Sequence, residues 1–170
     1  MTKLIPILAA AALVGATGTA VAQGTAAPQP IGATRAVAIA EKALSARALE
    51  ADLDHEKGRM VYEIELVRGG ALYEARVEAT SGKLVSQGKK RMESVWAGWF
   101  DKGKLDKAPK PLSATLAALE AETGGTVEEV GFDTDNGRAV YEVELTTNAG
   151  TAEIAIDAAT GKRLPAAFAD

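Results

Sequence analysis

One stretch of the chain returns almost unchanged 79 residues later. Residues 59–66 read RMVYEIEL, and residues 138–145 read RAVYEVEL, each directly after a glycine. The same offset aligns residues 34–83 with residues 113–162 without a gap and gives 15 identities in 50 positions. A tandem repeat of this kind restricts the fold to two copies of one small supersecondary unit, so any interpretation of one copy must also suit the other.

Each copy is predicted to form one helix followed by three strands. Alanine-rich segments predict helices over residues 35–46 and 114–122, with Thr34 and Ser113 as their N-caps. Alternating apolar residues then predict three strands joined by tight turns. The sequence therefore predicts an α+β fold of two repeats, each one helix packed on a three-stranded antiparallel meander sheet. The inward-facing residues of the second and third strands are predicted to be Tyr62, Ile64, Leu66, Tyr73, Ala75 and Val77 in the first copy, and Tyr141, Val143, Leu145, Ala152, Ile154 and Ile156 in the second.

The first 22 residues have the features of a cleavable secretory signal. A basic start precedes an apolar run over residues 4–14, and Ala20-Val21-Ala22 offers the small-x-small pattern for cleavage before Gln23. An uncleaved membrane anchor is the less favoured alternative, because the apolar run is shorter than the ~20 residues of a spanning helix. We expect a periplasmic or secreted protein with a disordered leader over residues 23–33.

Composition excludes most catalytic and metal chemistry. The 170 residues contain no cysteine, so disulfides, thiolate metal sites and cysteine nucleophiles are ruled out. The single histidine, His55, lies in a predicted turn and cannot supply the paired imidazoles of a zinc peptidase or a supported Ser-His-Asp triad. A formal net charge of −4 argues against nucleic-acid binding. We expect no enzyme, no cofactor, no metal site and no nucleic-acid partner.

The repeated motif resembles a known family. A helix, an acidic strand, an Asp-x-x-x-Gly-Arg turn, the strand Val-Tyr-Glu-Val-Glu-Leu and a strand ending in Asp-Ala-Ala-Thr-Gly-Lys are similar to the PepSY domain, and the match is closest over residues 137–145 and 154–162. The resemblance implies a small exported module that also occurs in propeptides of thermolysin-like metallopeptidases. It further implies an inhibitory or modulatory action on peptidases, without catalysis and without catalytic residues.

Opposed carboxylates are predicted on the outer side of each sheet. Two-residue turns would place Glu65 opposite Glu74, and Glu144 opposite Glu153. Like charges in direct opposition are unfavourable unless a cation or a basic partner lies over them. The surface has three possible roles, namely a docking face for a basic segment, a weak divalent-cation site, or a merely solvated sheet face. The candidate binding residues in the second copy are Glu142, Glu144, Glu153 and Asp157, and Glu129 extends the patch.

The connector between the copies, residues 89–111, is basic and aromatic. Residues 84–112 contain seven Lys and Arg against three Asp and Glu, whereas residues 113–162 contain two against ten. Trp96, Trp99 and Phe100 fall on one face of a predicted short helix. These side chains could complete a shared core, engage a partner protein or touch a membrane surface, and they are the remaining candidate binding residues.

The sequence therefore predicts a signal over residues 1–22, a leader, PepSY-like repeats over residues 34–88 and 112–166, and a connector between them. The expected function is a non-catalytic, exported binding module that restrains or modulates a peptidase or another envelope or secreted protein. The alternative is a periplasmic sensor or carrier of cations or small ligands, built on the duplicated carboxylates.

Overall fold

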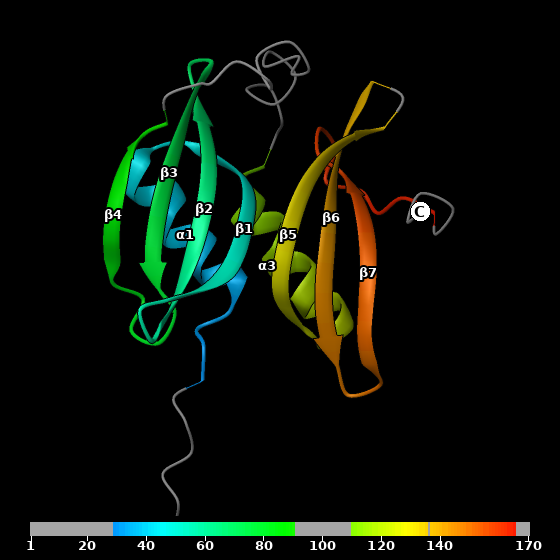
Figure 1. Cartoon of the computed structure of the whole chain (residues 1–170). Helices are drawn as coiled ribbons and strands as arrows, with labels where there is room; N and C mark the ends of the chain where they lie inside the picture. The colour runs from blue at the N-terminus through cyan, green and yellow to red at the C-terminus, as the bar shows by residue number, and fades with distance from the viewer. Residues whose placement is uncertain (1–28, 91–109, 136, 166–170) are drawn as a thin grey trace, which may run out of the picture.

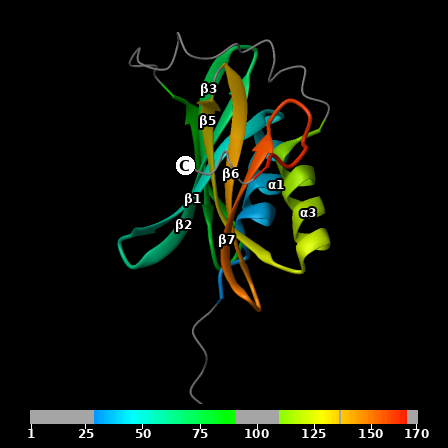
Figure 2. The ribbon, with the colours of Figure 1, turned by 90° about the vertical axis from the view of Figure 1, so that its right-hand side faces the viewer.

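The computed structural model describes residues 29–90, 110–135 and 137–165. Within them, seven strands form one antiparallel sheet in the order β4-β3-β2-β1-β5-β6-β7 (Figure 1). Helices α1 and α3 both cover the same face of the sheet, which gives a fold of two layers (Figure 2). The elements are α1 (Ala33–Leu44), β1 (Arg47–Glu56), β2 (Arg59–Arg68), β3 (Ala71–Glu78), β4 (Leu84–Lys89), α3 (Leu112–Thr123), β5 (Thr126–Asp135), β6 (Arg138–Thr147) and β7 (Gly150–Asp157).

The two copies join through the pairing of β1 with β5, which we call the seam. The strands run antiparallel, and Ala51 lies opposite Val130. These two residues are equivalent in the repeat, because they are 79 positions apart. Pairing equivalent residues of equivalent strands relates the copies by an approximate twofold axis through the seam. Apart from β4, the strand order is the same outward from the seam in both directions, which reflects this symmetry.

The core lies between the helices and the helix-facing side of the sheet. As predicted from the alternation, Tyr62, Ile64 and Leu66 of β2 are fully buried. Burial of an aliphatic side chain such as Ile64 or Leu66 contributes about 1.5 to 3 kcal/mol. Their counterparts in the second copy are buried as well, but Ala152 at the start of β7 is exposed, contrary to the prediction. In β6, the residues equivalent to Tyr62, Ile64 and Leu66 are Tyr141, Val143 and Leu145, and all three are buried.

The predicted meander of three strands per copy is wrong for the first copy, which has a fourth strand. β4 pairs antiparallel with β3, and Ala75 lies opposite Gln87. Its sequence, LVSQGK, lacks apolar alternation, and five of its six residues are exposed. Only Leu84 of this edge strand packs against the core, so the strand leaves no hydrophobic period in the sequence, which explains why alternation did not predict it. The copies also share a single sheet instead of forming one each.

Both helices begin earlier than predicted. The residues before their first turns are Gly32 and Pro111, so Thr34 and Ser113 are the second residues of the helices and do not cap them. The end of the predicted leader also belongs to the fold. The Ile31 amide donates a 2.7 Å hydrogen bond to the Ala79 carbonyl, and Ala33 is fully buried. This segment is ordered by contacts with residues at and just after the end of β3, which are far from it in the sequence.

Candidate binding surface

The sheet face that α1 and α3 leave uncovered carries a row of carboxylates across the seam. The predicted oppositions of Glu65 with Glu74 and of Glu144 with Glu153 are confirmed. Strand registers also align Glu63 with Asp52, and Glu129 with Glu144. The pairing of Ala51 with Val130 brings Asp52 beside Glu129. We call the resulting line of side chains the acidic row; its members are Glu63 (β2), Asp52 (β1), Glu129 (β5), Glu144 (β6) and Glu153 (β7).

Basic side chains neutralise the part of this face that belongs to the first copy. Arg76 of β3 lies next to Glu63 in the register and forms three ion pairs, with Glu56 at 2.7 Å, Glu63 at 2.9 Å and Glu74 at 2.9 Å. These carboxylates raise the pKa of Arg76, and the charge of Glu63 is the largest cause. Lys90 forms an ion pair with Glu65. Four carboxylates of the first copy therefore have a cation beside them.

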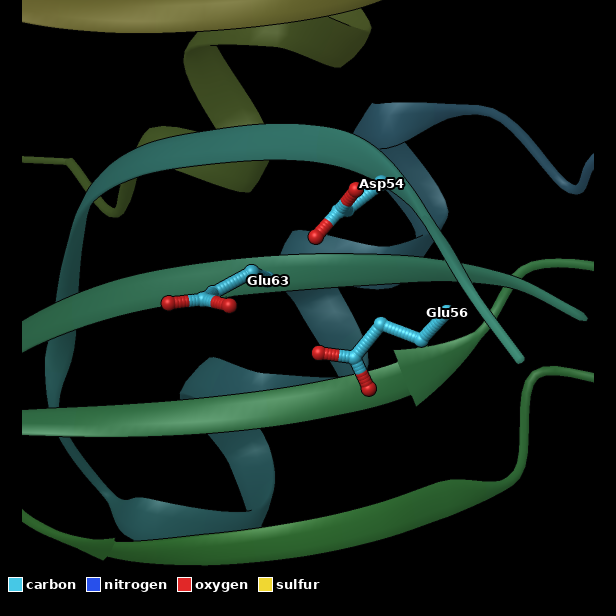
Figure 3. Close-up of side chains that lie close together, drawn as sticks. All are labelled: Asp54, Glu56 and Glu63. Atoms are coloured by element: carbon cyan, nitrogen blue, oxygen red, sulfur yellow. The ribbon is translucent and has the colours of Figure 1, made fainter.

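Three of the acidic side chains have a spacing that could suit a metal ion. The carboxylate oxygens of Asp54, Glu56 and Glu63 lie within 4.8 Å of one another, above neighbouring strands (Figure 3). Two of these three side chains already bind the Arg76 guanidinium. The positive charge that the cluster would recruit is therefore supplied by the chain itself, and we assign no metal to it.

The second copy has the same carboxylates without the arginine. Its residue equivalent to Arg76 is Ala155. Among the described residues, no ion pair involves Glu142, Glu144 or Glu153. Partial burial and the charges of Asp133 and Glu153 raise the pKa of Glu142. The outer face of the second copy therefore carries negative charge that the described part of the chain does not balance.

Asp157, the fourth predicted carboxylate, has a structural role. Its Oδ1 accepts hydrogen bonds of 2.8 Å from both the amide and the hydroxyl of Thr160 in the turn after β7. Its Oδ2 lies 3.6 Å from Arg138. Asp157 thus stabilises the turn at the end of β7, whereas Glu142, Glu144 and Glu153 face outward together. The other predicted binding residues, Trp96, Trp99 and Phe100, lie outside the described residues, so their role stays a prediction.

Sequence reasoning missed Glu41, a buried carboxylate that joins the two copies. Glu41 lies on α1, is 8% exposed and accepts hydrogen bonds from the first amides of α3, Leu112 at 3.0 Å and Ser113 at 3.3 Å. It also accepts bonds from the Ser113 hydroxyl and from the Ala48 amide at 3.2 Å. A carboxylate at a helix N-terminus satisfies unpaired amides and interacts favourably with the helix dipole. The sequence signal for Glu41 is that the equivalent position of the second copy, Glu120, is also a glutamate.

A small basic pocket of about 270 Å³ lies beside Glu41. Arg68 contributes to its wall, donates a 2.6 Å hydrogen bond to the Leu44 carbonyl and lies 4.7 Å from the centre of the Tyr73 ring. Another wall residue, Arg47, donates to the Lys110 carbonyl. These arginines bind backbone carbonyls at the end of α1 and just before α3, so we assign no ligand to the pocket.

No helix within the described ranges is long and apolar enough to cross a membrane. Among curated proteins, the chain is 33% identical over 129 residues to the uncharacterized protein YkoJ of Bacillus subtilis (strain 168), an alignment that covers 75% of this chain and 68% of that protein. A solved protein of Clostridium difficile 630, described as a candidate lipoprotein, is similar with a TM-score of 0.41 and 18% identity, over 81% of this chain and 91% of the other.

The profile of the PepSY family, described as "Peptidase propeptide and YPEB domain", matches the chain twice, over residues 30–87 and 113–164. The two matches coincide with the two copies of the fold, and together they cover more than half of the chain. None of these comparisons identifies a catalytic family. The protein therefore belongs to the PepSY family and contains two tandem PepSY domains.

Proposed function

We propose that the protein is a non-catalytic binding module that captures a basic polypeptide segment on the acidic outer face of its second domain. The observation that carries the proposal is the difference at equivalent positions. Arg76 and Lys90 balance the carboxylates of the first domain, whereas Glu142, Glu144 and Glu153 of the second have no ion pair within the described residues.

Electrostatics would favour a basic partner on this face. Glu144 and Glu153 lie directly opposite each other, an arrangement that is unfavourable in isolation and that a lysine or arginine placed between them would relieve. A surface of one charge sign also steers an oppositely charged partner during encounter and makes the association dependent on salt. The row continues across the seam to Asp52, so an extended segment could contact both domains.

A peptidase, or another envelope or secreted protein, is the partner we propose. The family description refers to peptidase propeptides, which supports a peptidase as the partner. In this proposal the module restrains or modulates the activity of the bound peptidase. Addition of the purified mature protein to a thermolysin-like metallopeptidase should slow hydrolysis of a peptide substrate. Unchanged hydrolysis at a large molar excess of the module would overturn this part of the proposal for that class of peptidase.

Export is the second part of the proposal. The signal pattern over residues 1–22 supports cleavage after Ala22 and release into the periplasm or the medium. N-terminal sequencing of exported protein should find Gln23 as the first residue. Recovery of Met1 on the exported protein would instead indicate an anchored form.

A pair of matched double variants tests the docking face. Glu144→Gln/Glu153→Gln removes two charges from the second domain, and Glu65→Gln/Glu74→Gln removes the equivalent two from the first. The probe is a fluorescent oligolysine peptide, with binding followed by anisotropy at low and high salt. We expect the second-domain variant to bind about tenfold more weakly and to lose part of its salt dependence, and the first-domain variant to lose less because its carboxylates already have cations.

Equal losses in the two variants would show that only net charge matters and would contradict a defined face. Calorimetry with calcium separates the alternative function, a cation sensor or carrier. Heat of binding that disappears in the Glu144→Gln/Glu153→Gln variant, without any peptide present, would favour the cation function over docking.

A further inference from the structure

Three carboxylates meet at the seam, where the two domains join. Glu50 and Asp52 are neighbours on the outer face of β1, and Asp52 lies beside Glu129 of β5. Glu50 lies opposite Gly131, where a Cβ would meet nothing within 4 Å. Asp52 is thus placed between an acid on its own strand and an acid of the other domain.

Carboxylates that lie this close together disfavour each other's ionisation. Partial burial, and next the charge of Asp52, raise the pKa of Glu50 to about 7. The charge of Glu65 adds to this shift, and Lys90 opposes it. Partial burial, and next the charge of Asp52, raise the pKa of Glu129, with a further contribution from the charge of Glu144.

The charged groups around the junction help to explain why the pKa values of Glu50 and Glu129 are raised. α1 and α3 lie on the other face of the sheet, so the groups that face the seam come from the strands and from the residue after β4. Among the residues that the structure describes, the two cations near the seam on this face, Arg76 and Lys90, lie on the first-domain side and already pair with carboxylates there. The other described groups around the seam on this face are acidic: Asp54 (β1), Glu63 and Glu65 (β2), Glu74 (β3), Asp133 (β5), Glu142 and Glu144 (β6) and Glu153 (β7).

We propose that Glu50, Asp52 and Glu129, which the strand register places side by side at the contact between the two domains, form a pH-sensitive junction, so that rising pH strengthens the docking face and loosens the seam. The expected effect of pH on binding rests on the proposed function. The expected effect of pH on stability rests on the junction alone, because the three carboxylates lie at the contact between the two domains.

The direction of the pH effect follows from proton linkage. A carboxyl group whose pKa is higher in the folded than in the unfolded protein binds more protons in the folded state. Stability is then unaffected below the unfolded value of 4.5 and is lost as the pH rises through the folded value of about 7. Over the same range the outer face gains negative charge, so it should attract a basic segment more strongly.

The direct measurement is a carbon-13 NMR titration of the side-chain carboxyl groups in the full mature chain. Glu50 should titrate with a midpoint near 7. In parallel, the urea midpoint of unfolding should fall between about pH 5 and about pH 8 in the wild type, and it should fall less in Glu50→Gln, which keeps the size of the side chain but cannot ionise. Glu78→Gln, on β3 away from the seam, is the control and should keep the wild-type slope.

Binding of oligolysine should tighten about two- to fivefold over this pH range at low salt, and less in Glu50→Gln. A Glu50 midpoint near its ordinary value, or an unchanged slope of stability in Glu50→Gln, would overturn the junction. Absence of oligolysine binding at every pH would overturn the docking function instead. The NMR and urea results would still decide whether the junction binds a proton and whether its ionisation destabilises the fold.

Discussion

The two domains share one fold and most of their acidic residues, but they differ in what surrounds those residues. Glu63, Glu65 and Glu74 of the first domain have identical sequence counterparts in Glu142, Glu144 and Glu153. In the first domain each has an ion-pair partner, whereas Ala155 replaces the central arginine in the second. The duplicated motif thus maintains the same fold in both copies, while the presence of Arg76 in one copy and of Ala155 in the other determines which copy carries unbalanced negative charge.

The largest expected effect tests whether the two cores are equivalent. Tyr62→Ala and Tyr141→Ala each remove a buried aromatic side chain from the middle strand of one domain, and each should lower the free energy of unfolding by about 2 to 4 kcal/mol. Urea unfolding followed by circular dichroism measures both. A loss below about 1 kcal/mol in either variant would contradict its burial.

The next effect separates the equivalent acids Glu41 and Glu120. Glu41→Gln weakens four hydrogen bonds that connect α1 to the start of α3 and to β1, and it should cost about 2 to 3 kcal/mol. Glu120 accepts a 2.9 Å bond from the Val127 amide within its own domain, so Glu120→Gln is the matched control and should cost about 1 kcal/mol. Equal losses would show that Glu41 does not hold the domains together.

A smaller effect is expected from making the first domain resemble the second. Arg76→Ala leaves Glu56, Glu63 and Glu74 without their shared cation and should destabilise the protein by about 1 kcal/mol, because the ion pairs are partly exposed. The same variant should bind oligolysine more tightly than the wild type. Arg59→Ala, which removes an exposed arginine at the start of β2, controls for net charge. If both variants gained affinity equally, the local arrangement around Arg76 would not matter.

The smallest effect concerns the two tyrosine hydroxyls. The Tyr141 hydroxyl donates a 3.2 Å hydrogen bond to the Ala48 carbonyl of the other domain, so Tyr141→Phe should cost about 1 kcal/mol. The buried Tyr62 hydroxyl has no partner of normal hydrogen-bond geometry among the described residues, although the nearby Gly32 backbone slightly opposes the rise of the Tyr62 pKa to about 12. Tyr62→Phe should therefore be neutral or slightly stabilising. The same urea experiment decides, and the reverse order would contradict the assignment.

The features that were predictable from sequence are those with a local period. Alternation and the 79-residue offset predicted the buried faces of β2 and β6, and two-residue turns predicted the carboxylate oppositions. Gly69 and Gly70 adopt φ of 54° and 74°, which favour glycine and set the register of the first hairpin. The family resemblance rested on the same motif and is confirmed.

The seam and the Glu41 contacts were not predictable, because each depends on residues far apart in sequence. A strand such as β1 shows in its own pattern which face is buried but not which strand it pairs with. Glu41 lies 71 residues before the Leu112 amide that it binds, and its local pattern is only that of a helical glutamate. The acidic row follows from the seam, so its extent across both domains could not be recognised before β1 and β5 were seen together.

The approximate symmetry at Ala51 and Val130 has a consequence for how this sequence can change. In a dimer of identical chains, every substitution near the axis would appear on both sides. Here Asp52 meets Glu129 on one side of the axis, whereas Glu50 meets Gly131 on the other, so one of two acid contacts is absent. Because the two copies are linked in one chain, a mutation can change one of two symmetry-related contacts and leave the other unchanged. In an assembly of identical subunits, the same mutation would change both contacts at once. Selection can therefore adjust this junction one contact at a time.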